Sequence, residues 1–411
     1  MVLVRNIIPF LIVTIMFISC TEKVCVCKCE TDNKKISNSN EYKDVDEFNY
    51  KTIKELEDQD KKSSSKIEKI KKTDKSSIEK EFKKIDLNNI KENTSNKFLM
   101  GEYPLKGDID HAVVDGDTIK VEGLKDSIRI LFIDTEESFK HETAEAKTEQ
   151  LVDDWDNYIS KQENSVTDKP IKFNTPIGYE ATLWARDFFK DSEMVRLEYD
   201  SLTNKKGYYN RHLAYVYGKK NDKWVNFNIE IVKAGYTPYS TKYGRSIRFH
   251  DQFVAAQKYA KKHKLGVWDP NKMHYTDYDV RLKWWNKRGD QIHEYRTKHN
   301  KTHLFIGGKF QDYWRLKNYI GKNVKIFALL KGAEGFGDEI TFKLPVRRFL
   351  DVYVHLSKKA GYSLEELKKH KDYYIYLNGK IIKENYTNDK GWKQFRFHLH
   401  INKKSGLRFA K

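Results

Sequence analysis

The chain has 411 residues, with 77 Lys and Arg against 59 Asp and Glu, which gives a formal net charge of +18. This length predicts two domains and additional terminal segments. The 8 Trp, 25 Tyr and 22 Phe are ample for hydrophobic cores and exclude a fully disordered chain, while the lack of a second apolar run of ~18 residues excludes several membrane spans. The positive charge predicts an anionic partner, nucleic acid or anionic lipid, unless it reflects only a coding bias toward Lys.

The N-terminus has the pattern of a secretory signal peptide over residues 1–19, in which Arg5 precedes the apolar residues 7–18. Residues 17–20, Phe-Ile-Ser-Cys, resemble the lipobox of bacterial lipoproteins. That resemblance implies that Cys20 is lipidated and that the protein is a membrane-anchored bacterial lipoprotein outside the cytoplasm. An ordinary signal peptide and an N-terminal anchor helix are the alternatives.

The 4 cysteines all lie in residues 20–29, so the folded part of the chain uses no disulfide and no thiolate metal site. The last three of them are suited either to a soft metal or to further acylation and oxidation. Residues 30–97 are polar and contain neither Gly nor Pro. Residues 20–97 are therefore predicted to form a lipidated, mostly disordered tether.

Apolar runs at residues 112–114, 118–121 and 128–133 predict three strands. The segment 115–117, Asp-Gly-Asp, predicts a turn between the first two, and the third run leads into the acidic segment 134–137. If these strands pair, the acids come close together, and clustered carboxylates need a cation or protonation. Oxygen ligands suit a hard ion such as calcium or magnesium.

Two arginines accompany these acids. Arg129 opens the third predicted strand, and Arg211 lies in the aromatic segment 207–217. Arg is suited to gripping a phosphodiester because its forked donors carry a permanent charge. Acids for a metal, an acid free to act as a base and two arginines together predict a phosphoryl-transfer site.

Three segments of the chain resemble the thermonuclease (staphylococcal nuclease) family in their order and spacing. They are 114–119 (Val-Asp-Gly-Asp-Thr-Ile), 129–137 (Arg-Ile-Leu-Phe-Ile-Asp-Thr-Glu-Glu) and 211–217 (Arg-His-Leu-Ala-Tyr-Val-Tyr). Residues 178–189 add a matching helix. The resemblance covers about residues 105–270. Because the composition of the chain changes at about Phe98, residues 98–270 are assigned to a thermonuclease-like domain. It implies an α+β fold, mainly β with helices, built on a five-stranded OB-type barrel. It also implies calcium-dependent hydrolysis of DNA and RNA phosphodiesters that leaves a 3′-phosphate.

The resemblance also implies roles for the acidic residues. Asp117 and Asp134 match the carboxylate ligands of the calcium ion, and the backbone carbonyl of Thr135 matches a further ligand. Glu137 matches the general base that deprotonates or orients the attacking water. Asp115 matches an acid near the metal and is expected to form the turn or to lie behind the direct ligands.

Arg129 and Arg211 match the two phosphate-binding arginines of the family, and Tyr209 matches a tyrosine near the substrate phosphate. All five matching catalytic and carboxylate positions are retained, which favours activity over a pseudo-nuclease that only binds: Asp117, Arg129, Asp134, Glu137 and Arg211.

Two features depart from the family pattern. Glu136 stands where proline is frequent, and we expect it to add a negative charge beside the metal. Residues 138–177 form a long acidic insertion, in which residues 143–158 are predicted to be helical. The insertion is either a lid over the site or an additional surface element.

Residues 271–411 hold 31 basic and 14 acidic residues, so most of the net charge lies in this second predicted domain. A helical segment at 277–300 contains neighbouring Trp and Arg residues, which either stack on bases or pack internally. Ser363 and Glu366 predict a capping box that starts a helix. Five strands are predicted around that helix, at 323–330, 339–344, 350–356, 373–382 and 395–401. This order is that of an OB-like barrel.

Together these features predict a calcium-dependent endonuclease at the cell surface that acts on DNA, RNA or both, with a basic OB-like domain that captures polyanions. No protein partner is inferred. A non-catalytic nucleic-acid-binding lipoprotein and an adhesion lipoprotein are the alternatives.

Overall fold

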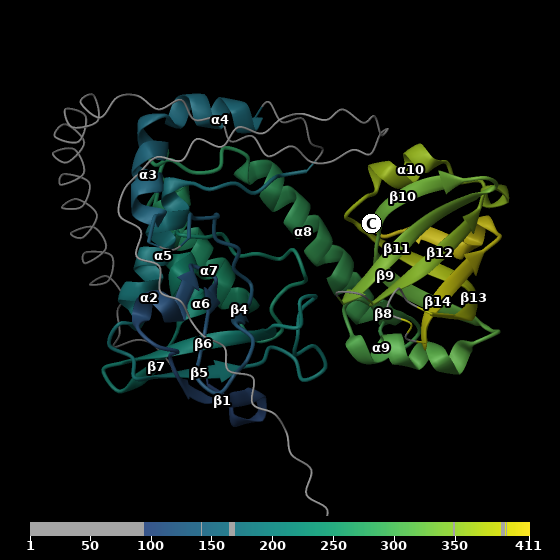
Figure 1. Cartoon of the computed structure of the whole chain (residues 1–411), viewed down its shortest axis with the longest axis horizontal. Helices are drawn as coiled ribbons and strands as arrows, with labels where there is room; N and C mark the ends of the chain where they lie inside the picture. The colour runs from purple at the N-terminus through teal and green to yellow at the C-terminus, as the bar shows by residue number, and fades with distance from the viewer. Residues whose placement is uncertain (1–93, 141, 164–168, 348–349, 388–390, 392) are drawn as a thin grey trace, which may run out of the picture. The chain divides into compact units, whose positions relative to one another are not determined.

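The computed structural model describes residues 94–411 except 141, 164–168, 348–349, 388–390 and 392 (Figure 1). The predicted signal peptide, the lipidation site Cys20 and almost the whole of the predicted tether lie outside the described residues. Among the residues described, no helix is both long enough and apolar enough to cross a membrane.

The first domain contains one sheet and the helices around it. Its strands are β1 (Leu99–Pro104), β2 (Val113–Asp115), β3 (Thr118–Ile119), β4 (Ile128–Ile130), β5 (Met194–Glu198), β6 (His212–Lys220) and β7 (Lys223–Asn226). Its helices are η1 (Asn96–Phe98), α2 (Ile109–Ala112), α3 (Ala144–Asp153), α4 (Trp155–Glu163), α5 (Pro176–Phe189), α6 (Phe227–Lys233), α7 (His250–Lys262) and η2 (Gly266–Trp268).

The strand order in this sheet is β1-β5-β6-β4-β3-β2, with β7 beside β6. Strands β4 and β6 are parallel, and the other pairs are antiparallel. Because β1 and β2 are consecutive in the chain but lie at opposite ends of this order, the sheet curls back toward itself. A bridge between Leu105 and Val121 continues β1 toward the β3 end. The α+β fold predicted for this domain is confirmed, and the curled strand order is that of an OB-type barrel.

The core explains why these segments form strands and helices. Residues 214–218 of β6 are buried without interruption, as expected for a strand covered on both faces. Helix α5 begins after Thr175, whose side chain accepts a hydrogen bond from the Gly178 amide at 3.1 Å, and Pro176 occupies the first turn. Its Trp184 and Phe188 pack against Phe227 with ring centroids 5.7 and 5.1 Å apart.

Two predicted elements differ in extent. The third predicted strand, 128–133, stops at Ile130 because Phe132 has a positive φ of 61°, which turns the chain out of the sheet. The helix predicted at 143–158 is two helices, α3 and α4, separated at Asp154.

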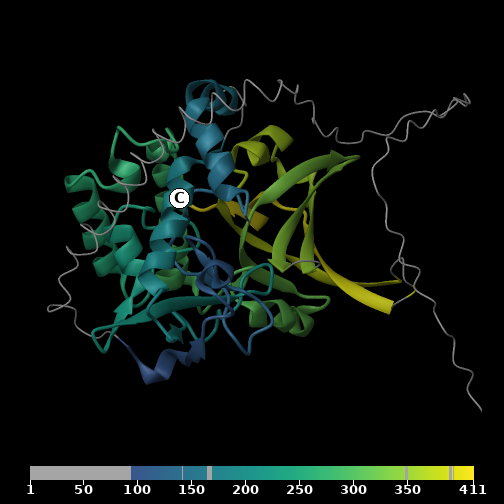
Figure 2. The ribbon, with the colours of Figure 1, turned by 60° about the vertical axis from the view of Figure 1, so that its left-hand side comes forward.

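The second domain is a separate sheet. Its strands are β8 (Leu304–Ile306), β9 (Asn323–Leu329), β10 (Lys331–Phe336), β11 (Glu339–Arg347), β12 (Leu350–Ser357), β13 (Tyr374–Thr387), β14 (Lys393–Ile401) and β15 (Leu407–Phe409). Its helices are α9 (Phe310–Arg315), η4 (Leu316–Tyr319), η5 (Lys358–Ala360), α10 (Leu364–Lys369) and η6 (Lys404–Gly406). The last part of β13 forms a long antiparallel hairpin with β14, drawn in yellow in Figure 2.

The order of this sheet is β10-β11-β12-β14-β13-β9-β8, and β12 and β14 are parallel. Only Leu330 separates β9 from β10, so the two form one nearly continuous strand. This strand pairs with β11 through β10 and with β13 through β9, and the sheet therefore closes into a five-stranded barrel. Helix α10 lies between β12 and β13 and begins at the predicted place, where Ser363 accepts a hydrogen bond from the Glu366 amide at 3.0 Å. The second domain therefore has the same OB-type strand order as the first.

Helix α8 (Tyr278–Glu294) and the π-helical turn η3 (Tyr295–His299) form the segment predicted at 277–300. Trp284 and Trp285 are buried, with 8% and 1% of their surface exposed, so they pack internally and are not available to stack on bases. The Gln291 side chain donates to the Ala410 carbonyl at 2.9 Å and accepts from the Tyr374 amide at 3.0 Å.

Gly178, in the first turn of α5, is expected to be required because the backbone of residues 136–137 packs directly against it. A Cβ at this position would lie 2.2 Å from the Glu137 carbonyl oxygen, a backbone atom that cannot move away cheaply. We expect Gly178→Ala to destabilise the protein by ~1–3 kcal/mol, measured as a lower midpoint of urea unfolding. The matched control is Gly335→Ala, where the nearest atom to the added Cβ would be 3.7 Å away. Equal midpoints for the two variants would contradict this account of the α5 packing.

Candidate active site

The candidate site lies where the β2–β3 turn meets the segment that follows β4. Asp115 ends β2 and Asp117 lies in the turn, and the Asp117 amide donates to Asp115 Oδ1 at 3.2 Å. Arg129 lies in β4, where it pairs with Thr118 of β3 on one side and with Leu213 of β6 on the other. The sheet thus fixes this arginine at the centre of the first domain.

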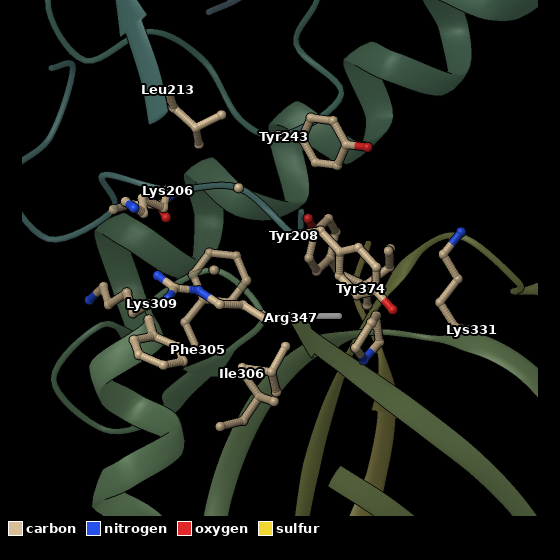
Figure 3. Close-up of a pocket in the computed structure, with 18 of the residues that line it drawn as sticks. Lys206, Tyr208, Leu213, Tyr243, Phe305, Ile306, Lys309, Lys331, Arg347 and Tyr374 are labelled. Atoms are coloured by element: carbon tan, nitrogen blue, oxygen red, sulfur yellow. The ribbon is translucent and has the colours of Figure 1, made fainter. Parts of the chain in front are cut away.

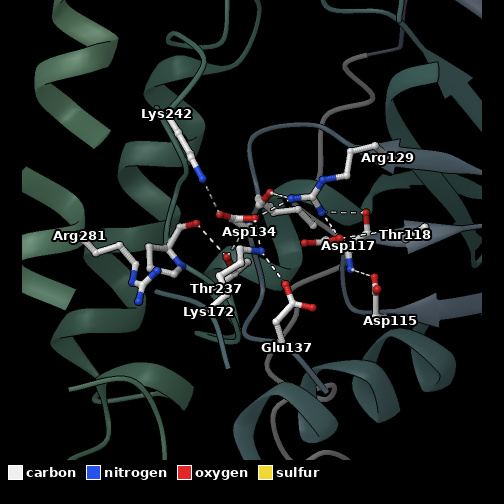
Figure 4. A network of polar contacts seen from close by, with 12 residues as sticks. Asp115, Asp117, Thr118, Arg129, Asp134, Glu137, Lys172, Thr237, Lys242 and Arg281 are labelled. Atoms are coloured by element: carbon white, nitrogen blue, oxygen red, sulfur yellow. Dashed lines mark hydrogen bonds and ion pairs between the residues drawn. The ribbon is translucent and has the colours of Figure 1, made fainter. Parts of the chain in front are cut away.

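Arg129 joins the two aspartates that the resemblance assigns to the metal (Figure 4). Its Nη1 forms an ion pair with the Asp117 carboxylate, and its Nη2 contacts Asp134 Oδ1 at 2.7 Å. The same guanidinium donates to the backbone carbonyls of Asp117 and Ile133, both at 3.2 Å. Asp117 and Asp134, 17 positions apart in sequence, therefore converge on one cation.

Asp134 is the most heavily compensated charge of the site. Besides Arg129, Lys172 Nζ lies 3.0 Å from its Oδ1 and Lys242 Nζ lies 3.9 Å from its Oδ2. Burial alone would raise the pKa of Asp134, but the positive charges of Lys172, Arg129 and Lys242 outweigh it and hold the pKa well below 3.8. Thr237 fixes the backbone by accepting from the Asp134 amide at 3.1 Å. Asp134 is therefore ionised in the folded protein.

Lys172 comes from the acidic insertion and was not predicted as a site residue. Its Nζ also contacts Glu137 Oε1 at 2.8 Å, so it bridges Glu137 and Asp134. Burial disfavours its charge, but the two carboxylates outweigh burial and raise its pKa. A bridge between Glu137 and Asn174, and a hydrogen bond from the Thr175 amide to the Glu137 carbonyl at 3.0 Å, hold this part of the insertion in place. These contacts join residues that are distant in sequence. The position of Lys172 in the site could therefore not be recognised from a local sequence pattern.

Glu136 and Glu137 have opposite environments. The Glu137 side chain is 38% exposed and takes part in the network. Glu136 is buried, and its Oε1 accepts from the Tyr275 amide at 2.9 Å and from the Tyr278 hydroxyl at 2.6 Å. Burial raises the pKa of Glu136. The expectation that Glu136 adds a charge beside the metal ligands is therefore wrong, because its side chain is tied to the segment before α8 and to α8 itself.

Arg211 and Tyr209 lie on the loop that leads into β6. Arg211 is half-buried and lines the same cavity as Arg129 and Asp134. Burial lowers the pKa of Arg211, and the nearby charge of Arg129 acts in the same direction. Tyr209 is 62% exposed, with the Arg211 guanidinium 6.0 Å from its ring centroid. Both side chains are thus available to a ligand, whereas Asp117, Arg129 and Asp134 already contact one another.

The remaining predicted residues support the turn. Asp115 forms an ion pair with Lys140 of the insertion at 3.4 Å. Thr135 is buried and packs against Gly116 so closely that a Cβ there would lie 2.7 Å from Thr135 Cγ2. Asn210, between Tyr209 and Arg211, has a positive φ of 64°, which Asn tolerates.

The donor set of this site fits a hard cation. Among the residues described, no three His, Cys, Asp or Glu side chains converge closely enough to hold a metal by themselves. The Asp117 and Asp134 carboxylates nevertheless converge on one positive group, and carboxylate and carbonyl oxygens are the ligands that calcium prefers. These two carboxylates are the charged oxygens of the site that could hold such an ion.

Comparisons with known proteins agree with this geometry. The family model described as "Staphylococcal nuclease homologue" matches residues 127–270, a range that includes Arg129, Asp134, Glu137 and Arg211. Over 159 residues the chain is 30% identical to "Uncharacterized protein MJ1439" of Methanocaldococcus jannaschii, and the alignment covers 38% of this chain and 69% of that protein.

A second relative is "Probable endonuclease lcl3" of Sclerotinia sclerotiorum, with 32% identity over 111 residues, which cover 26% of this chain and 40% of that protein. The chain thus spans less than half of this relative but more than two thirds of the archaeal one. On the matched residues and the extent of the first alignment, the chain belongs to the staphylococcal nuclease homologue family.

Proposed function

We propose that this protein is a calcium-dependent endonuclease that hydrolyses phosphodiester bonds of DNA, RNA or both. The observation that carries the proposal is the network in which Arg129 joins Asp117 to Asp134 and Lys172 joins Asp134 to Glu137. Arg211 lines the cavity that Arg129 and Asp134 also line. The family of the chain and the name of the fungal relative, a probable endonuclease, support the same class of activity.

In this mechanism each residue has a task that follows from its chemistry. Arg129 and Arg211 bind the phosphodiester, and their permanent charges offset the negative charge that grows on phosphorus oxygens in the transition state. Glu137, the most exposed acid of the network, orients or deprotonates the attacking water. Asp117, Asp134 and the Thr135 carbonyl would hold calcium, which supplies Lewis-acid stabilisation of the phosphoryl oxygens.

We further propose that the protein acts outside the cytoplasm while attached to a membrane through a lipid on Cys20. This part of the proposal is supported by the sequence of residues 1–20. Asp115 is expected to act indirectly, because it shapes the turn that carries Asp117. Tyr209, exposed beside Arg211, is expected to touch the substrate.

The activity is expected to need both calcium and Arg211. The purified full chain should cleave a labelled oligonucleotide in calcium and stop when EGTA is added. Arg211→Ala should lower kcat by about 10²–10³-fold, the typical cost of removing one group that stabilises transition-state charge. Gel analysis of the cleavage products under both conditions measures the effect.

The matched control for Arg211 is Arg186→Ala, which removes a half-buried arginine of α5 that pairs with Asp110 at 3.1 Å and does not line the cavity. This variant should keep the activity of the wild type. If the wild type cleaves neither DNA nor RNA with any divalent ion, the protein is a binding protein and the enzymatic proposal fails.

Lys172 is expected to compete with calcium, because its ammonium group lies within 3.0 Å of the Asp134 and Glu137 carboxylates. Lys172→Met removes that cation and leaves the carboxylates more negative. The calcium concentration for half-maximal cleavage should fall by about tenfold, which corresponds to ~1.4 kcal/mol. A calcium titration of the cleavage rate measures this shift.

The control is Lys140→Met, another lysine of the insertion, whose ion pair involves only Asp115. It should leave the calcium requirement within about twofold, as expected for an exposed pair. A Lys172→Met enzyme that needs as much calcium as the wild type, or more, would show that Lys172 does not compete for the site.

A further inference from the structure

A large cavity connects the candidate active site with the second domain. It has a volume of about 1260 Å³ and is lined by Arg129 and Arg211 of the first domain and by residues of β10, β11 and β12 of the second. Pockets for small ligands usually hold ~300–1,000 Å³. The cavity is therefore larger than a site for one mononucleotide requires, and it extends beyond the family domain.

The charge of the cavity lining is predominantly positive. Eight lining residues are Lys or Arg, and four are Asp or Glu. Two of these four acids are already engaged: Asp134 contacts Arg129, and buried Asp200 accepts a hydrogen bond from Tyr215 at 2.6 Å. The cavity thus has an excess of cations facing its interior, which favours a polyanion as the occupant.

The second domain presents its cations on one face of the sheet. Successive residues of a strand point to opposite faces, so Phe342, Leu344 and Val354 are buried in the barrel while Lys343 and Tyr353 lie on the outer face. Lys343 and Tyr353 are directly paired across β11 and β12, with Lys343 Nζ 5.3 Å from the tyrosine ring centroid. This face lines the cavity.

Arg347, at the end of β11, reaches the loop of the catalytic arginine. Its Nη1 lies 3.5 Å from Asn210 Oδ1, next to Arg211 in the sequence, and its guanidinium stacks over Phe310 at 3.5 Å. Figure 3 shows Arg347 in the cavity together with Lys206 and Lys309. A chain of positive groups therefore runs from the active site onto the sheet of the second domain.

Aromatic rings of the cavity lining accompany these cations, and one of them, Tyr353, is half-buried. Tyr208 and Tyr243 line the cavity and are 42% and 70% exposed. Tyr353 stacks on His398 with ring centroids 5.4 Å apart, and the Arg396 guanidinium lies 5.2 Å from its centroid. Aromatic rings beside cations bind unpaired bases by stacking, which is not possible for bases inside a duplex. The combination indicates a single strand as the occupant.

We propose that this cavity is a channel for single-stranded nucleic acid, which runs from Arg211 to the outer face of β11 and β12. In it, Lys343 and Arg347 bind backbone phosphates and Tyr353 stacks on a base. The proposal rests on the proposed nuclease function, because it gives the second domain the task of holding the strand whose phosphodiester is cleaved.

The test combines binding and cleavage with the full chain. Binding of a fluorescein-labelled single-stranded oligothymidylate is measured by anisotropy in EGTA. The double variant Lys343→Ala/Arg347→Ala should raise Kd about tenfold at low salt and reduce the salt slope by about 1.4, since each phosphate contact on a single strand contributes ~0.7. Tyr353→Ala should raise Kd about tenfold, whereas Tyr353→Phe, which keeps the ring, should not.

Cleavage kinetics distinguish an effect on strand binding in the channel from an effect on the catalytic site. Lys343→Ala and Tyr353→Ala should raise KM for the long single strand and leave kcat and the cleavage of a dinucleotide unchanged. Arg347→Ala is not used for this comparison, because it also removes the contact to Asn210 beside Arg211. The charge-matched control is Lys358→Ala/Lys359→Ala, in the same domain but outside the cavity lining. Lys343→Ala alone, at an exposed strand position, serves as the test if Arg347→Ala impairs folding.

The outcomes distinguish this inference from the proposed function. If the wild type cleaves nucleic acid but the variants bind and cleave long strands like the wild type, the channel is wrong and the nuclease stands. If no divalent ion supports cleavage but the variants lose binding as expected, the nuclease fails and the channel stands. Equal losses on a duplex for Tyr353→Ala would contradict a single-strand channel.

Discussion

The structure of the candidate site depends on the compensation of one buried carboxylate. A buried charge is costly unless it is paired and hydrogen-bonded. Asp134 is compensated by Arg129, Lys172 and Lys242, which belong to β4, to the insertion and to the segment before α7. Three parts of the chain that are distant in sequence are therefore held at the same place by this group.

The barrel provides the rigid part of this arrangement. Arg129 is fixed between β3 and β6, and the parallel pairing of β4 with β6 places Arg211, which precedes β6, beside the start of β4. The insertion completes the site, because its Lys172 contacts both Asp134 and Glu137. An acidic insertion thus contributes a cation to the site, and its acidic composition alone did not indicate that role.

Features that depend on local chemistry could be predicted from the sequence. The Asp-Gly-Asp turn and the start of α10 at Ser363 follow from residues close together in the chain. The OB-type order of the first domain was predicted from the family resemblance, and that of the second from the succession of its elements, because strand pairing itself is long-range. Lys172 and the inward direction of Glu136 could not be predicted, because each depends on contacts with residues far away in sequence. The burial of Trp285 was one of the two alternatives that the sequence left open. The channel likewise could not be predicted from the sequence, because its lining residues come from both domains.

The central claim is that the carboxylates gathered around Arg129 carry phosphodiester hydrolysis. Its most direct test is single-turnover cleavage of a labelled oligonucleotide in calcium by the wild type and by Asp134→Asn, with thermal unfolding to verify that the variant is folded. The variant keeps the shape of the side chain and the Thr237 contact to its backbone amide. We predict that it cleaves at least ~100-fold more slowly than the wild type. A folded Asp134→Asn protein that cleaves at the rate of the wild type would contradict this account.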